Sequence, residues 1–177
     1  LPCRSVAQTI FTGQGLLAGE VTDNSVILHA RFTAGEALIK GDVPGARAVA
    51  CFEVADNELF KNATRTDWAE AGSTNDFIVQ ARIDGLKPGI QHYYRVWFGL
   101  HPKLAQTDVA RGFKTLPGAA DTRAMTFTMS GPMHYKAWTS GPDSPPPGSL
   151  AADDRAAGYP ALRPMYRLRP DFHVSLG

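Results

Sequence analysis

The stretch I-D-G-L-K-P-G-I-Q-H-Y-Y-R-V-W-F, residues Ile83–Phe98, decides the fold of this chain. It begins with a turn, because Gly85, Pro88 and Gly89 interrupt regular structure and the proline ring fixes φ. The strand that follows is rich in aromatic and β-branched residues, which suits a half-buried sheet. Its side chains are expected to alternate, with one face carrying Ile90, His92, Tyr94 and Val96, and the other Gln91, Tyr93, Arg95 and Trp97.

The chain up to Pro117 repeats this pattern in about six or seven short strands separated by turn signals. The clearest strands are predicted at Leu16–Val21, Ser25–Phe32, Ala46–Val54, Asp76–Ile83, Ile90–Phe98 and Ala110–Leu116. No long helix is predicted in this part of the chain, so we expect a mainly β protein with an antiparallel β-sandwich of immunoglobulin or fibronectin III type. The core between its sheets is expected to contain Leu28, Phe52, Ile90 and Val96.

The pattern changes after Pro117. A strand is predicted at Ala124–Ser130, an interrupted helix at Asp153–Leu168 and a second strand at Asp171–Gly177. This order is typical of the first βαβ unit of a parallel α/β sheet. The predicted domains are therefore a tail or edge strand over residues 1–14, a sandwich over 15–117 and an incomplete α/β domain over 118–177. Parallel sheets are covered on both faces, so either more chain is expected to follow in the parent protein, or this unit is expected to pack on the sandwich or on a partner.

Composition excludes several classes of partner. The net charge is +1, from 18 Lys and Arg against 17 Asp and Glu, and the basic residues are scattered. This distribution argues against nucleic acid or an acidic membrane as the partner. No apolar run is long enough for a transmembrane helix. The chain begins with Leu1, which either the removal of a secretory signal or a deliberate truncation would explain.

Two features of the predicted sandwich leave alternatives open. Cys3 and Cys51 are too few for a disulfide framework; they pair in an oxidising compartment or remain two free thiols, and Cys51 is expected to face outward. The stripe formed by Tyr93, Arg95 and Trp97 is expected to be a protein interface or a face against the next domain.

Candidate site residues lie near the end of the predicted strand Ala124–Ser130, since open α/β sheets bind ligands at the carboxyl ends of their strands. His134 is a candidate metal or substrate contact, although a loop histidine without a role is the favoured interpretation. Ser130 and Gly131 offer a close backbone approach to a phosphate. His173, inside the last strand, is expected to be a satisfied core histidine. No His, Asp or Glu set has the spacing of metal ligands, so no metal site is expected within the chain itself.

Four stretches, in this order, resemble motifs of the PhoD-like alkaline phosphatase/phosphodiesterase family. Gly19–Arg31, G-E-V-T-D-N-S-V-I-L-H-A-R, is similar to its opening hairpin, and Leu86–Val96 is similar to its L-x-P-G-T-x-Y-x-Y-R-V. Gly112–Pro117, G-F-K-T-L-P, resembles the end of its sandwich. Gly158–Gly177 resembles the helix and strand that lead into its first acidic metal motif.

The sequence departs from the family pattern at several positions. His29 stands where the family has Trp, and His92 stands where it has a corner Tyr. Gly131 occupies the place of a Cys that ligates iron in the family. Gly177 lies one residue before the expected metal-binding Asp. The resemblance therefore implies that the catalytic residues lie beyond Gly177.

The resemblance implies a secreted or periplasmic, metal-dependent phosphoesterase, of alkaline phosphatase or phosphodiesterase/phospholipase D type. Iron and calcium are the implied cofactors of the parent protein, with a phosphate ester as substrate and the remainder of the phosphoesterase domain as partner. The chain alone is expected to be inactive and to bind none of these cofactors. Two alternatives stay open: a purple-acid-phosphatase-like N-terminal domain, and a non-catalytic secreted immunoglobulin-like module for binding or spacing.

Overall fold

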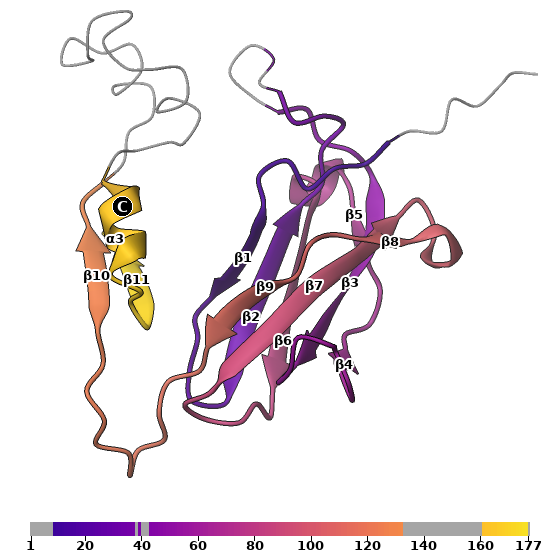
Figure 1. Ribbon diagram of the computed structural model, residues 1–177. Coiled ribbons are helices and arrows are strands. Elements are labelled where there is room, and N and C mark those ends of the chain that lie inside the picture. Colours follow the sequence, from indigo (N-terminus) through magenta and orange to yellow (C-terminus); the bar gives the residue numbers. More distant parts are fainter. Residues whose placement is uncertain (1–8, 38, 40–42, 133–160, 177) are drawn as a thin grey trace, which may run out of the picture. The chain divides into compact units, whose positions relative to one another are not determined.

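The computed structural model describes residues 9–37, 39, 43–132 and 161–176 (Figure 1). They belong to two compact units, Leu1–Asp121 and Thr122–Gly177. No helix in the described part of the chain is long and apolar enough to cross a membrane.

The first unit consists of two antiparallel sheets. The smaller sheet has the order β1 (Leu16–Gly19), β2 (Ser25–Arg31) and β6 (Ile78–Asp84). The larger sheet is built on β3 (Ala48–Ala55) and β7 (Gln91–Gly99). Its short outer strands are β4 (Thr64–Arg65), β5 (Ala69–Ala71), β8 (Gln106–Thr107) and β9 (Arg111–Lys114). Two 3₁₀ turns, η1 (Ser73–Asn75) and η2 (Pro102–Leu104), complete the unit. The predicted antiparallel, mainly β fold is thus confirmed.

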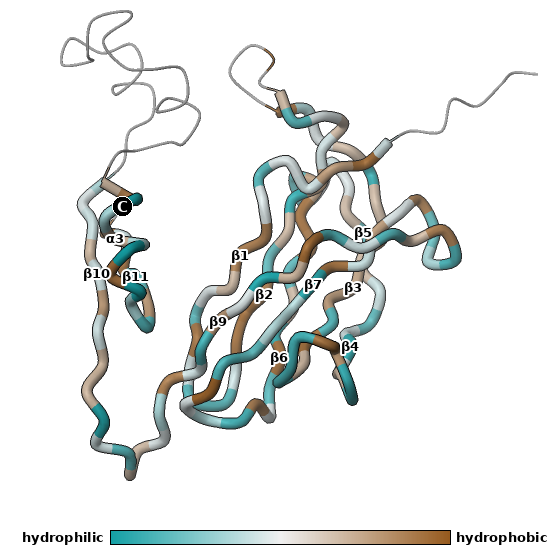
Figure 2. The backbone as a smooth tube through the Cα atoms, in the orientation of Figure 1, coloured by the Kyte–Doolittle hydropathy of each residue, from teal (hydrophilic) through white to brown (hydrophobic). Residues whose placement is uncertain are grey.

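The core lies between the two sheets. Leu28 of β2, Phe52 of β3 and Val96 of β7 are fully buried in one cluster, as predicted. Buried and more exposed residues alternate along β6 and β7, and the buried residues of both sheets form one cluster. Figure 2 shows hydrophobic residues on the strands of both sheets. The prediction for Ile90 is wrong, because this residue is only half-buried and lies outside the buried cluster. It precedes β7 in the turn, where its backbone groups bond to Thr115.

A histidine closes the turn before β7. His92 is 3% exposed, and its ring stacks on Phe113 of β9 with centroids 5.4 Å apart. Its Nε2–H donates to the backbone carbonyl of Lys87 over 3.0 Å. A tyrosine hydroxyl makes the equivalent backbone contact in the tyrosine corner of immunoglobulin-like sandwiches. Thr115 donates to the same carbonyl over 2.7 Å, so two side chains fix the turn.

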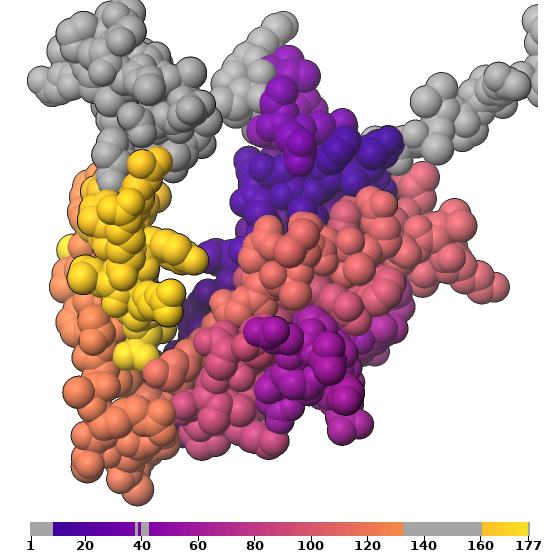
Figure 3. All heavy atoms as spheres, in the orientation of Figure 1, coloured from indigo at the N-terminus to yellow at the C-terminus, as the bar shows by residue number. Residues whose placement is uncertain are grey.

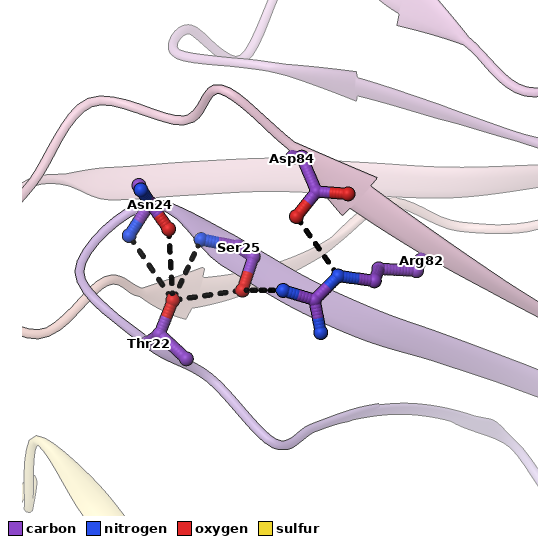
Figure 4. A network of polar contacts seen from close by, with 5 residues as sticks. All are labelled: Thr22, Asn24, Ser25, Arg82 and Asp84. Atoms are coloured by element: carbon purple, nitrogen blue, oxygen red, sulfur yellow. Dashed lines mark hydrogen bonds and ion pairs between the residues drawn. The ribbon is translucent and has the colours of Figure 1, made fainter.

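A network of polar contacts fixes the turn between β1 and β2 (Figure 4). The hydroxyl of Thr22 accepts from the backbone N–H of Asn24 and of Ser25, over 3.2 and 2.9 Å. The buried Ser25 hydroxyl in turn accepts from Nη2 of Arg82, over 3.1 Å. Arg82 also pairs with Asp84, its neighbour on β6. Because Arg82 belongs to β6, the network fastens the turn to the adjacent strand and satisfies a buried hydroxyl.

The second unit contains β10 (Phe127–Ser130), α3 (Leu162–Arg167) and β11 (Phe172–Ser175). The two strands pair in parallel, as expected for strands joined by a crossover. The helix is shorter than predicted among the described residues. Pro164 is its third residue, a place where the missing N–H costs little. The predicted start at Asp153 lies outside the described residues.

Candidate functional site

The two sides of the β10–β11 pair differ in polarity. Thr128 lies opposite His173, and Ser130 lies opposite Ser175, so these four residues share one side. The other side carries Phe127, Met129, Phe172 and Val174. The alternation of polar and apolar residues along both strands already predicts these two sides.

His173 links the two hydroxyl groups of β10 on the polar side. Its Nδ1 lies 2.9 Å from the hydroxyl oxygen of Thr128, and its Nε2 lies 3.2 Å from that of Ser130. A neutral imidazole donates at one nitrogen and accepts at the other, and a hydroxyl can take either role. Both ring nitrogens are therefore satisfied. The expectation of a core histidine is wrong, however, because His173 is exposed; only Thr128 is buried, at 8% exposure.

A hollow of about 800 Å³ lies beside this polar side. Leu162, Met165 and Tyr166 of α3 line it together with Thr128 and His173. Arg167 and Arg169 follow at the carboxyl end of the helix and also line the hollow. The hollow thus combines an apolar wall with hydroxyl, imidazole and guanidinium groups, a composition common in ligand sites.

The strand ends carry few metal ligands. Ser130 ends β10 and Gly131, which has no side chain, follows it; His134 and Gly177 lie outside the described residues. In the described part of the chain, no group of three or more His, Cys, Asp or Glu side chains is placed to hold a metal ion. His173 is the one strong donor among the four residues of the polar side. These residues do not fit a metal centre by themselves.

The first unit carries a second polar group, on the outer face of its larger sheet. Glu53 of β3 lies between Arg65 of β4 and Arg95 of β7 in the strand register. Its carboxylate accepts from Nε of Arg65 over 2.9 Å, from Nε of Arg95 over 2.5 Å and from the indole N–H of Trp97 over 3.0 Å. Arg95 and Trp97 of the predicted stripe therefore belong to a cluster that also contains Glu53 of β3 and Arg65 of β4.

Arg65, Arg95 and Trp97 surround the carboxylate of Glu53. Glu53 is 6% exposed. Burial is the largest influence on its pKa and raises it, but the hydrogen bonds from Trp97, Arg95 and Arg65 together outweigh burial, so the pKa of Glu53 is lowered. Cys51 lies opposite Trp97 in the register, on the same face as Glu53.

Cys51 lies on the outer face of the sheet, as predicted, but it is not exposed to solvent. The residue is 1% exposed and is a free thiol in the structure. Its pKa is raised by burial, which the nearby Arg65 only partly offsets. The alternation of side chains along the strand predicts the face on which Cys51 lies. Its burial depends on large side chains from β4 and β7, which the sequence of β3 alone does not reveal. Cys3 lies outside the described residues.

Sequence reasoning missed Glu53 and Arg65 as members of this cluster. Glu53 interrupts an otherwise apolar strand, A-V-A-C-F-E-V-A, and a buried carboxylate must have partners. That interruption was the available signal. The partners in β4 could not be found, because residues 56–72 carry no regular period.

Residues 4–117 match the family model described as "PhoD-like phosphatase, N-terminal domain". A solved structure of PhoD aligns with 78% of this chain at 25% identity and a TM-score of 0.57, and the chain spans only 26% of the PhoD chain. No curated protein sequence matches.

Smaller solved domains show weaker similarity. The sensor domain of the anti-sigma factor RsgI4 of Pseudobacteroides cellulosolvens is 17% identical, with a TM-score of 0.40 over 62% of this chain and 86% of its own. The fibronectin type III domain of human fibronectin type III domain containing protein 3 is 9% identical, with a TM-score of 0.40 over 62% of this chain and 88% of its own.

Proposed function

Because this chain belongs to the family of PhoD-like phosphatase N-terminal domains, we propose that it is the amino-terminal part of a metal-dependent phosphoesterase. The first unit is the family's sandwich domain. The second unit is proposed to begin the catalytic α/β domain, whose substrate is a phosphate monoester or diester. We also propose that the parent protein is exported to the periplasm or the medium, as the family resemblance implies.

The observation that carries this proposal is the exposed apolar side of the second unit. Phe127 and Met129 of β10 are 52% and 51% exposed, although Thr128, which lies between them and points to the other side of the strand, is buried. Parallel strands are normally covered on both sides. Further strands and helices of an α/β domain would cover these side chains, and the rest of that domain is the partner we propose.

The PhoD alignment supports the same interpretation. It covers 78% of the chain, a larger share than residues 4–117 occupy. The likeness to PhoD thus extends beyond the sandwich. A domain of fibronectin III type used alone for binding or spacing would not account for a parallel β10–β11 pair after the sandwich.

The proposal assigns the metal ligands to residues outside the described part of the chain. The polar side of β10–β11 offers His173 as its single strong donor, and Gly131 supplies no side chain at the strand end. Iron and calcium, the metals that the resemblance implies, would therefore need ligands from outside the described residues. For this chain alone we propose neither metal binding nor hydrolysis.

The experiment compares two proteins: this chain of 177 residues, and a chain extended to the stop codon of its gene. Both are purified, their iron and calcium contents are measured by elemental analysis, and hydrolysis of p-nitrophenyl phosphate and of its bis-ester is followed. The extended chain is expected to contain metal and to hydrolyse at least one ester. The shorter chain is expected to do neither.

Two results would contradict the proposal. An extended, folded chain without metal or turnover would exclude a functional phosphoesterase in the parent protein. Stoichiometric metal in the shorter chain, with turnover abolished by His134→Ala, would show that the site lies within residues 1–177 after all. His101→Ala, on an exposed turn of the sandwich, is the matched control.

A further inference from the structure

The outer face of the larger sheet holds two guanidinium groups close together. We call Arg65 and Arg95 the arginine pair. Both bond to the one carboxylate of Glu53, Arg65 to Oε1 and Arg95 to Oε2. Both also lie over the ring of Trp97, with Cζ 5.0 Å and 5.2 Å from the centroid. Like charges repel, and the contacts with Glu53 and Trp97 offset that repulsion.

The arginine pair is held rigidly before any ligand arrives. Arg95 lies over a second ring, that of Phe60, with Cζ 4.1 Å from its centroid. Contacts with a carboxylate and with aromatic faces restrict the rotamers of a long side chain, and that ordering otherwise opposes binding. The pair is in this sense preorganised.

The loop before β4, which carries Phe60, has an unfavourable backbone conformation at this residue. Phe60 has φ of 53°, in the left-handed region that bulky side chains rarely adopt. The side chain of Asn57 stabilises the loop, accepting from the N–H of Lys61 and donating to its carbonyl, each over 3.0 Å. Backbone strain of this kind often marks functional sites. Figure 3 shows the loop and β4, in purple, at the surface of the first unit.

The hydrogen-bonding capacity of the arginine pair is only partly used. Each guanidinium bonds to Glu53 through Nε, and the Nη atoms of both have no hydrogen-bond partner in the part of the chain that the structure describes. The side chain of Arg65 is 53% exposed and that of Arg95 is 27% exposed. The Nη groups are the donors with which arginine binds carboxylates and phosphates in a fork.

The local charge also favours an anion. Two guanidinium groups face one buried carboxylate, so Glu53 balances only one of the two positive charges. Glu58 accepts a hydrogen bond from the hydroxyl of Tyr93, which raises the pKa of this tyrosine and leaves the Glu58 carboxylate charged. Glu53 itself is enclosed and bonds to both Arg residues and to Trp97, so an incoming anion meets donors rather than carboxylate oxygens.

We propose that the arginine pair is a binding site for an oxyanion, and that its ligand is the phosphate group of an ester. The choice of phosphate among oxyanions rests on the proposed function, since a phosphoesterase encounters phosphate esters as substrates and inorganic phosphate as product. The oxyanion site itself rests on the geometry alone. Arg65 and Arg95 bind the phosphate oxygens through Nη, while Glu53, Trp97 and Phe60 position the two guanidinium groups.

The test uses nitrogen-15 NMR of the full chain, which observes arginine Nε–H and indole Nε1–H groups directly. Inorganic phosphate and phenyl phosphate are titrated at constant ionic strength, with sodium chloride as the salt control and succinate as a carboxylate dianion. We expect saturable shifts of the Nε–H signals of Arg65 and Arg95 and of the Trp97 indole signal. Arg65→Lys should raise the half-saturating phosphate concentration about tenfold, since lysine lacks the planar fork.

The matched control is Arg82→Lys. Arg82 is a similarly exposed arginine, 54% against 53%, and pairs with one carboxylate on the other sheet. It should leave phosphate binding unchanged. Equal effects of the two substitutions, or shifts that do not saturate, would overturn the site. Tighter binding of succinate than of phosphate would overturn the phosphate assignment.

A second measurement does not depend on any variant. Phosphate bound to the native state raises the unfolding midpoint of the wild-type chain relative to chloride at equal ionic strength; an unchanged midpoint at saturating phosphate would also refute the site. Neither measurement needs metal or turnover. Failure here leaves the proposed phosphoesterase standing, whereas failure of the extended chain to hydrolyse esters leaves the oxyanion site but removes the reason to prefer phosphate.

Discussion

The two units of this chain treat their apolar side chains differently. In the first unit Phe52, Leu28 and Val96 are completely enclosed between two sheets. In the second, Phe127 and Met129 lie on a strand of the same alternating pattern but remain about half exposed. Alternation defines which side chains share a face of a sheet, but burial requires a second layer. The sandwich contains both layers, whereas the described part of the second unit contains a single two-stranded sheet and a short helix.

The same contrast holds for polar groups. The buried Glu53 has three donors on its carboxylate, as a charge removed from water requires. The hydroxyl and imidazole groups of the second unit bond to one another near solvent. Substitutions in the first unit should therefore change stability strongly, and equivalent substitutions in the second should change it little.

The largest expected effect is the truncation of a core side chain in the sandwich. Phe52→Ala removes a fully buried ring from β3 and should destabilise the first unit by about 3–5 kcal/mol, through lost burial and the cavity left behind. Urea unfolding followed by circular dichroism measures this loss. Leu59→Ala, at a residue that is 75% exposed, should change the midpoint little; similar losses in both variants would refute the assigned core.

The second largest effect concerns the charged cluster. Glu53→Gln leaves the arginine pair without its carboxylate and should cost about 2–3 kcal/mol at neutral pH, less than for a fully buried ion pair because both guanidinium groups reach solvent. The pKa of Glu53 is lowered below its ordinary value of 4.5 in the folded state. Its stabilisation is therefore complete above the unfolded-state pKa and disappears as the pH falls through the folded-state pKa.

Unfolding midpoints of the wild type and of Glu53→Gln should consequently converge in acid and diverge at neutral pH. Asp84→Asn is the control, since this carboxylate is 63% exposed and pairs with Arg82 at the surface. A difference between wild type and Glu53→Gln that is independent of pH would show that the ionised carboxylate does not stabilise the cluster.

A smaller effect is expected at the histidine corner. His92→Phe retains an aromatic ring against Phe113 but removes the donor to the Lys87 carbonyl, which Thr115 still engages. The loss should be about 0.5–1.5 kcal/mol, the contribution of one hydrogen bond. Differential scanning calorimetry compares it with His101→Phe on the exposed turn. Equal shifts of the two melting temperatures would argue that the corner hydrogen bond contributes nothing.

Much of the sandwich was predictable because its strands are short runs of apolar, aromatic and β-branched residues separated by turn signals. The strands around Val26, Phe52 and Val96 are confirmed, and so is the family resemblance over residues 4–117. Ile90 misled because the period of β7 extends by one residue into a turn, where backbone bonds to Thr115 decide its position. Periodicity cannot show where a strand ends.

The candidate sites were less predictable, since they depend on contacts between distant segments. Arg65 meets Glu53 only because β4 returns alongside β3, and residues 56–72 gave no pattern from which to infer that return. Ser130 and His173 are brought together by strand pairing across residues that the sequence separates widely. His134 and Gly177, also chosen from sequence, lie outside the described residues.

The smallest effect in this chain should come from the apolar side of the second unit. Phe127→Ser replaces a ring that is 52% exposed and stacked on Phe172, with centroids 5.3 Å apart. Because the ring still contacts water, its loss should change the unfolding free energy of this chain by no more than about 1 kcal/mol. In the extended chain the proposed domain covers this ring, so the same substitution should then cost about 3–5 kcal/mol. Urea unfolding of Phe127→Ser in both lengths, with Leu59→Ser as the control, measures the difference directly. A cost that is small in both lengths would mean that nothing packs on this side of β10–β11, and the second unit would then not begin a larger α/β domain.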